Sequence, residues 1–403
     1  MDHHRISRCG RAGARTIALL ALLAAGPAAA LFVSNLRRNE PWPEPVRTAT
    51  AVGDSTCLSC HSDKASYEGT AHRLTIQRPS HATIAGNFQA GSNVLRTPNP
   101  NLYFHMDADS AGFTQTAVLR NGKDSTTRTE RIAYVSGTRK GQSYLYWEGN
   151  QLYQLPISYW ASLGTWINSP GYVDGSMNFE RRISPRCLEC HSTWIRQIMD
   201  PGASNRYDST GVILGITCER CHAAGQEHVA RERSALRALK GPAIVNPARM
   251  SRQRQMDACA QCHGGLGHPI TPTFTYVAGK PLERYVTLTA PKANERIDVH
   301  GNQVAALMRS RCYQASQMTC LTCHDPHRTQ RDPTELSGRC LTCHQEQSCK
   351  LFPKQGHALK GRCVDCHMPL QESDLIDSGL EGTEERALER THWIKVWGNG
   401  TSR

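Results

Sequence analysis

Cysteine and histidine recur in one fixed pattern, Cys-x-x-Cys-His, seven times along the 403-residue chain. On a helical turn, residues three and four positions apart lie on the same face, so both thiols and the imidazole of such a pattern point the same way. Two thiols at this spacing can form thioethers with the two vinyl groups of a haem, and the adjacent imidazole can then bind the iron. The pattern therefore predicts covalent haem attachment at seven places.

We number these patterns motif 1 to motif 7 in chain order: residues 57–61, 187–191, 218–222, 259–263, 320–324, 340–344 and 363–367. The predicted attachment residues are Cys57, Cys60, Cys187, Cys190, Cys218, Cys221, Cys259, Cys262, Cys320, Cys323, Cys340, Cys343, Cys363 and Cys366. The predicted proximal iron ligands are His61, His191, His222, His263, His324, His344 and His367.

Zinc is the main competing interpretation of these cysteines. Zinc knuckles join two Cys-x-x-Cys hooks in one tetrahedral centre and require no histidine after every second cysteine. Because each centre takes two hooks, seven hooks cannot be divided into pairs. A thioredoxin-like redox motif would occur once. The spacing therefore favours seven covalently attached haem c groups.

Each iron also needs a sixth ligand, or it stays open to substrate. Nine histidines lie outside the motifs and the N-terminal segment: His72, His81, His105, His228, His268, His300, His327, His357 and His392. Nine candidates for seven positions favour closed, bis-histidine irons. His327 follows His324 across a proline turn, so these two should serve different irons, while His81, His105 and His268 compete for the last place. Met368 adjoins a proximal ligand and should not reach the opposite face.

The formal net charge of +12 would fit an acidic partner such as nucleic acid. Haem propionates are the alternative acidic groups, since seven haems carry two each and offset the positive charge. We therefore expect no nucleic-acid partner. The apolar fraction of 39% is low for a globular chain, which indicates that haems fill much of the core.

The first residues have the features of an export signal. A basic stretch with four arginines precedes the apolar residues 17–33, and Ala28, Ala29 and Ala30 offer a cleavage site. The apolar stretch is also nearly long enough to span a bilayer. Residues 1–35 are thus predicted to be a cleaved signal or a retained N-terminal anchor, and the sequence favours neither. Either implies a periplasmic protein, with a membrane tether in the second case.

The motifs divide the rest of the chain unevenly. Residues 36–54 form a Pro-rich linker and 55–86 a first haem segment, while 183–395 carry six motifs. The stretch between them, 87–182, has no cysteine and is predicted to be a β-rich insert that either shields haems or docks a partner. Its expected strands are 113–119, 131–135, 144–147 and 151–157, with a two-residue turn at 149–150. Trp147, Trp160 and Trp166 should form a small aromatic core, and a helix is expected over 227–240.

The expected fold class is a mainly α and irregular multihaem cytochrome c fold, wrapped on stacked haems, with an all-β insert. Cys312 and Cys349 are the two cysteines beyond the N-terminal segment that no motif uses. In an oxidising compartment they are predicted to form a disulfide, which would brace motifs 5 and 6.

Several stretches resemble a known family. These are VGDSTCLSCHSDKASYEGTAH at 52–72, RCLECH at 186–191, VHGNQVAALMRSRCYQASQMTCLTCHDPH at 299–327 and CVDCHMP at 363–369. Over about residues 52–395 the chain resembles the cytochrome c-554 and c-552-type multihaem family. That resemblance implies distal ligands at His72, His228, His300, His327, His357 and His392, with haems packed in close pairs that relay electrons. Nitrite-reducing relatives often carry a Cys-x-x-Cys-Lys motif, and none occurs here.

The sequence thus predicts a periplasmic electron carrier rather than a catalyst, exchanging electrons with redox proteins such as a membrane quinol oxidoreductase or another cytochrome. The alternative is a multihaem oxidoreductase with one open haem, acting on a small nitrogen or sulfur species. A third hypothesis is a polymer whose haems form a wire, with His81 or His105 binding a neighbour's iron.

Overall fold

The computed structural model describes residues 43–138, 140–200, 202–234, 243–288, 302–380 and 385–397. The chain divides into two compact units, one of Met1–Pro43 with Gly225–Ile244 and one of Glu44–Ala224 with Val245–Arg403. In the first unit the structure describes one helix, α5 (Gln226–Glu232). It confirms the start of the helix expected over 227–240, whose later part lies outside the described residues. All other elements belong to the second unit.

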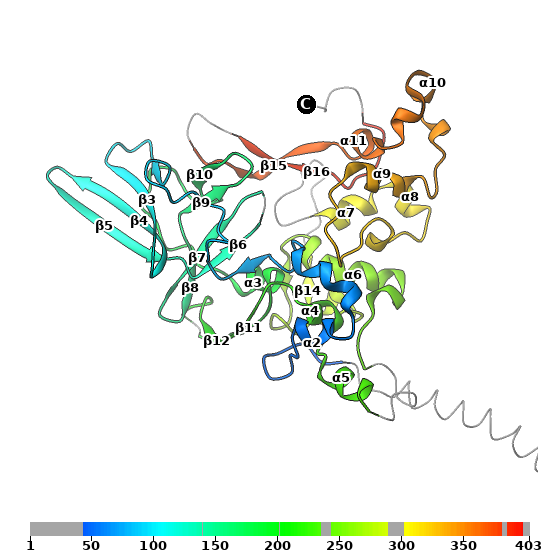
Figure 1. The fold of residues 1–403 in the computed structure, drawn as a ribbon, viewed down its shortest axis with the longest axis horizontal. Helices are drawn as coiled ribbons and strands as arrows, with labels where there is room; N and C mark the ends of the chain where they lie inside the picture. Colours follow the sequence, from blue (N-terminus) through cyan, green and yellow to red (C-terminus); the bar gives the residue numbers. More distant parts are fainter. Residues whose placement is uncertain are drawn as a thin grey trace, which may run out of the picture. The chain divides into compact units, whose positions relative to one another are not determined.

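Antiparallel strands are more extensive than the sequence predicted (Figure 1). One four-stranded sheet has the order β2-β3-β4-β5 and a second the order β1-β6-β7-β8. The strands are β1 (Ile76–Gln77), β2 (Val94–Arg96), β3 (Leu102–Asp109), β4 (Gly112–Asn121), β5 (Asp124–Arg131), β6 (Tyr134–Ser136), β7 (Ser143–Glu148) and β8 (Gln151–Gln154). Two-stranded sheets pair β9 (Ile157–Trp160) with β10 (Thr165–Asn168), β11 (Ser192–Gln197) with β12 (Tyr207–Leu214), β13 (His268–Pro269) with β14 (Val286–Thr287), and β15 (Leu370–Asp377) with β16 (Arg386–Arg390).

The two central sheets enclose an aromatic core. Side chains of β3 and β4 alternate between buried and partly exposed positions, which is the pattern of strands with one covered face. Phe104 and Phe113 pack there with Tyr144 and Trp166. The predicted turn at 149–150 joins β7 to β8, where Glu148 pairs with Gln151. The strand expected over 131–135 instead spans the end of β5 and the start of β6.

The three tryptophans expected to share one core do not. Trp166 belongs to the central cluster, Trp147 packs with Tyr134 and Tyr207, and Trp160 joins Ile167 and Ala387. They separate because they lie on different strands, β10, β7 and β9, whose faces meet different neighbours. The prediction of a single aromatic core was wrong.

The remaining elements are short helices that surround the motifs. The α-helices are α2 (Asp54–Leu58), α3 (Pro185–His191), α4 (Cys218–His222), α6 (Arg252–His263), α7 (Gln303–Met308), α8 (Arg311–Gln314), α9 (Pro333–Cys340), α10 (Phe352–Gln355) and α11 (Cys363–His367). The 3₁₀ helices are η1 (Ser62–Gly69), η2 (Pro247–Arg249), η3 (Leu282–Arg284), η4 (Cys320–Thr322), η5 (Glu346–Ser348) and η6 (Gly356–Leu359). Among the described residues no helix is long and apolar enough to cross a membrane, and residues 17–33 lie outside them.

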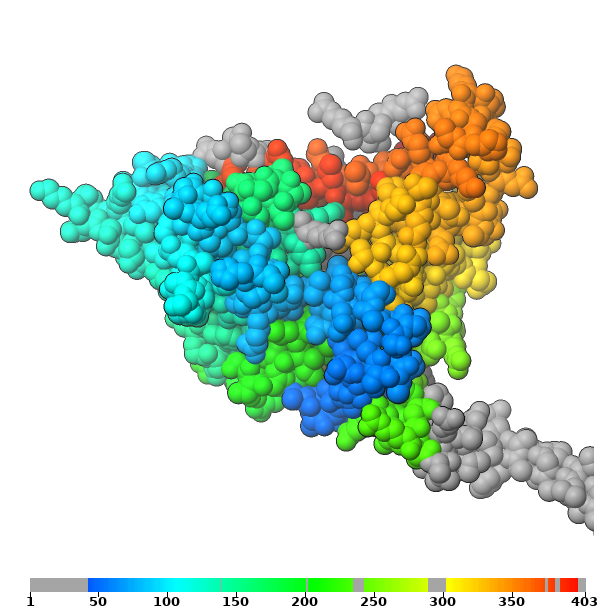
Figure 2. Space-filling model, in the orientation of Figure 1, coloured from blue at the N-terminus to red at the C-terminus, as the bar shows by residue number. Residues whose placement is uncertain are grey.

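The C-terminal hairpin β15–β16 connects the strand-rich part with the last motif. Ala387 packs against Trp160 and Ile167, and the Asn168 amide donates a 2.6 Å hydrogen bond to the Gly379 carbonyl. Figure 2 shows the cyan strands and the yellow-to-orange motif segments on opposite sides of one face, with the blue first-haem segment between them.

Candidate haem sites

Each motif forms the helical turn that its spacing predicts. Motifs 2, 3, 4 and 7 end the helices α3, α4, α6 and α11. In motifs 1, 5 and 6 the histidine N–H donates to the carbonyl of the first cysteine, four residues earlier, at 2.9 to 3.0 Å. The two cysteines and the histidine of each motif therefore lie on one face of a turn, as covalent attachment of a haem requires.

Motifs 1 and 3 cap each other's helices. The carboxylate of Asp54, in the first turn of α2, accepts the Cys218 N–H at 2.9 Å. Glu219, in α4, accepts in return the backbone N–H groups of Val52 at 3.1 Å and Gly53 at 3.1 Å. Helices of five residues leave most of their first N–H groups unpaired, so these carboxylates supply acceptors that neither helix has alone.

Cysteines of different motifs lie side by side. Four pairs of thiols from different motifs lie close enough for one thiol to shift the pKa of the other: Cys57 with Cys218, Cys190 with Cys262, Cys259 with Cys320, and Cys340 with Cys363. Cys221 also interacts with Cys262, and Cys323 with Cys343. In space the motifs therefore follow the order 1, 3, 4, 5, 6, 7, and motif 2 lies beside motif 4.

Three motif histidines each lie opposite a histidine from outside the motifs. The ring centres of His263 and His72 are 5.9 Å apart, those of His222 and His327 6.1 Å, and those of His324 and His392 6.2 Å. An imidazole nitrogen binds a metal at about 2 Å, so two rings on opposite sides of one iron have centres about 6 Å apart. These residues therefore fit a haem iron between each pair.

Burial keeps several of these rings in the neutral form. It lowers the pKa of His72 to about 4, with a further contribution from His263, and it lowers the pKa of His392 to about 4. Burial also lowers the pKa of His263 and that of His324. Neutral imidazole is the form that binds a metal. The His392 Nδ1 atom is buried without a hydrogen-bond partner among the described residues, which leaves a nitrogen for an additional group.

Backbone carbonyls orient two of the proximal histidines. His222 Nδ1 lies 2.8 Å from the Val245 carbonyl oxygen, and His367 Nδ1 lies 3.0 Å from the Lys395 carbonyl oxygen. Such a bond places the proton on Nδ1 and leaves Nε2 for the iron. His191 Nδ1 instead lies 3.4 Å from Thr75 Oγ1 and 3.3 Å from Ser136 Oγ, on β6. A search for ligand side chains in the sequence misses Val245 and Lys395, because they act through their backbone.

Of the other predicted distal histidines, His357 forms no such ring pair with a motif histidine in the described residues. His228 lies in α5, in the other unit, and His300 lies outside the described residues. His357 has a side chain that is 78% exposed, and its Nδ1 lies 2.9 Å from Glu346. No second histidine ring lies against His344 or His367 in the described part of the chain.

Three histidines compete for the seventh distal position: His81, His105 and His268. In the described residues, the contacts of these three are with residues other than the motif histidines. His105 uses both ring nitrogens, 2.7 Å from Asp107 and 2.8 Å from the Asn93 amide. The His81 ring packs on Phe113, and His268 is exposed on β13. His105 is therefore held by the strands rather than available for an iron.

The predicted disulfide is absent, since Cys312 and Cys349 are both free thiols. Cys312 lies beside Cys323 and Cys340, whereas Cys349 lies beside Cys363. The prediction was wrong because the fold places the two residues next to different motifs. Among the described residues, no three histidine, cysteine or acidic side chains come together as a metal site.

Residues 168–223 match the family model of cytochrome c554 and c-prime. This stretch contains motifs 2 and 3 with β11 and β12 between them. Over these residues the chain is similar to that cytochrome family. No curated protein and no solved structure matches it. The match covers a smaller part of the chain than the stretches that resemble the family in sequence.

Proposed function

We propose that this protein is a c-type cytochrome that carries seven covalent haems and relays electrons between redox partners through bis-histidine irons. The observation that carries the proposal is the set of three ring pairs, each joining a motif histidine to a histidine from elsewhere in the chain. When bound, a haem c iron alternates between its ferric and ferrous states and so carries one electron.

The chain's own residues would supply the ligands and fix their orientation. His263 with His72, His222 with His327, and His324 with His392 would hold the irons of motifs 4, 3 and 5. The carbonyl of Val245 keeps His222 in the tautomer that leaves Nε2 for the metal. Two imidazole ligands leave no vacant position for substrate, which favours electron transfer over bond activation.

The order of the motifs in space supports a relay. In the series of motifs 1, 3, 4, 5, 6 and 7, each motif has a cysteine beside a cysteine of the next motif. Haems attached at adjacent motifs would be close neighbours, and electrons pass most readily between neighbours. Motif 2 adds a branch beside motif 4, next to the strands β1 and β6 through Thr75 and Ser136.

The site of action is proposed from the N-terminal residues. A basic and then apolar beginning is typical of export, which would place the mature protein in the periplasm, either free or tethered to the membrane. There it would exchange electrons with a quinol oxidoreductase or another cytochrome.

Carbon monoxide separates this function from the competing one, an oxidoreductase of a small nitrogen or sulfur species. That enzyme needs an open iron, and motifs 6 and 7 are where one would be sought, because His344 and His367 lack a second histidine ring in the described residues. We expect carbon monoxide to leave the spectrum of the reduced protein unchanged. A shift equivalent to one haem would instead support the enzyme.

A further inference from the structure

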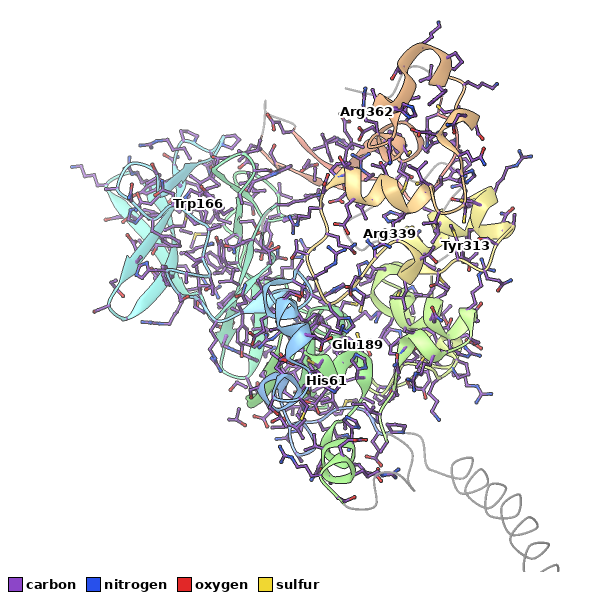
Figure 3. All side chains as sticks on the ribbon, turned by 45° about the vertical axis from the view of Figure 1, so that its right-hand side comes forward. His61, Trp166, Glu189, Tyr313, Arg339 and Arg362 are labelled. Atoms are coloured by element: carbon purple, nitrogen blue, oxygen red, sulfur yellow. The ribbon has the colours of Figure 1, made fainter. Side chains whose placement is uncertain are left out.

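A buried carboxylate lies at the junction of three motifs. Glu189 is one of the two variable residues of motif 2 and is 6% exposed. Its carboxylate accepts hydrogen bonds from the Arg186 guanidinium at 2.7 Å, the Phe274 N–H at 2.7 Å and the Gln261 amide at 3.3 Å. In Figure 3, Glu189 lies among the helices that carry the motifs.

The partners of Glu189 come from three motifs. Arg220 is a variable residue of motif 3, 3.7 Å from the Glu189 carboxylate, and its guanidinium donates to the Glu189 carbonyl at 3.1 Å. Gln261 is a variable residue of motif 4. Arg186 precedes motif 2 and donates to the carbonyl oxygens of Leu266 and Gln261. Glu189, Arg220 and Gln261 all occupy x positions of the Cys-x-x-Cys-His pattern. Their contacts connect motifs 2, 3 and 4.

A buried charge at this position affects neighbouring groups in a way that an uncharged side chain of the same size would not. Removing a carboxylate from water is unfavourable, and well-packed apolar residues can replace buried ion pairs with no loss of stability. The charge of Glu189 is screened little by solvent, so it acts on neighbouring groups more strongly than a surface charge would. A fixed negative charge stabilises the more positive, oxidised state of a nearby iron.

We propose that Glu189 is a positioning residue that also lowers the reduction potentials of the haems at motifs 2, 3 and 4. Arg220 acts on the same groups with the opposite sign. The inference rests on the proposed haem attachment at these motifs. Since motif 2 branches from the relay here, the Glu189–Arg220 pair sets how readily electrons remain at the branch point.

A redox titration of the holoprotein, followed by its visible spectrum, tests this inference. We expect Glu189→Gln to move at least one midpoint potential to a more positive value and Arg220→Gln to move at least one to a more negative value. Glu189→Asp keeps the charge and should return the potentials toward those of the wild type. Glu148→Gln is the matched control, because Glu148 is exposed on β7, and it should change nothing.

The direction of the shifts distinguishes electrostatics from structure. A purely structural role would disturb both variants in the same direction, so shifts of one sign, or unchanged potentials in both variants, overturn the inference. Loss of haem from both variants also counts against it, because the pair would then matter only for folding. Haem content measured beforehand by mass separates these results from a failure of the proposed function, in which the wild type itself would lack the haems.

Discussion

The Asp54 carboxylate accepts the backbone N–H of Cys218 at 2.9 Å, so the helix that leads into motif 1 caps the helix of motif 3, although the two residues are 164 positions apart. The other carboxylate oxygen of Asp54 accepts the Arg73 guanidinium at 2.6 Å. Because Glu219 caps the helix of motif 1 in return, the two motifs stabilise each other. Haems attached to them would be held as a pair by the protein rather than only by their own contact.

Replacing Asp54 tests this mutual capping. Asp54→Ala removes both the cap and the ion pair with Arg73, and should lower the free energy of unfolding by about 2–3 kcal/mol. A chemical denaturation curve followed by circular dichroism measures the change. Asp63→Ala is the control, since Asp63 is exposed in η1 and pairs with the adjacent Lys64. Equal midpoints for the two variants would rule out a stabilising role for the cap.

Removing a distal histidine should open one iron. His392→Ala leaves the backbone bonds between this segment and Ser310 in place, but removes the ring opposite His324. We expect the reduced variant to bind carbon monoxide at one haem. His105→Ala, whose ring is held by Asp107 and Asn93, should bind none. If the His392 variant also binds none, His392 is not an iron ligand.

The strand-rich part should be destabilised without loss of haem. Trp166 is buried against Phe88, Tyr144 and Tyr159, and its indole N–H donates to the Ser92 carbonyl at 2.9 Å. Trp166→Ala should therefore cost about 3–5 kcal/mol of stability. Thermal unfolding, with the number of attached haems measured by mass, checks both parts. The exposed Leu163 offers the control Leu163→Ala. A variant that loses haem would show that the strands are needed to build the haem sites.

The sequence predicted local features better than long-range ones. The helical turns of the motifs and the hairpin at 149–150 follow from spacing and turn chemistry within a few residues. Strand β5 was missed because its sequence, DSTTRTER, is polar and mostly exposed, so it has no apolar alternation. The segment forms a strand because it pairs with β4.

The pairing of residues far apart could not be predicted from spacing. His72 follows motif 1 but lies opposite His263 of motif 4, and His327 follows motif 5 but lies opposite His222 of motif 3. Such pairs depend on how the short helices pack, which no local pattern encodes. The same reason explains the failed disulfide, since Cys312 and Cys349 are separated by motifs 5 and 6 in the sequence and lie beside different motifs in space.

The N-terminal residues should determine where the chain is found. Deleting residues 1–35 removes the basic and apolar segment and should leave the protein in the cytoplasm of an expressing bacterium. For the full chain, fractionation followed by a high-salt wash separates a retained anchor, which stays with the membrane, from a mature protein that begins at Leu31. Export of the shortened chain would contradict the role assigned to this segment.

The mass of the denatured holoprotein tests the central claim most directly. Thioether bonds survive denaturation, so each attached haem adds its full mass to the polypeptide. We predict an increase of seven haems over the chain mass expected after any signal cleavage, one for each Cys-x-x-Cys-His motif. An increase of four haems or fewer would contradict the assignment of all seven motifs to haem attachment.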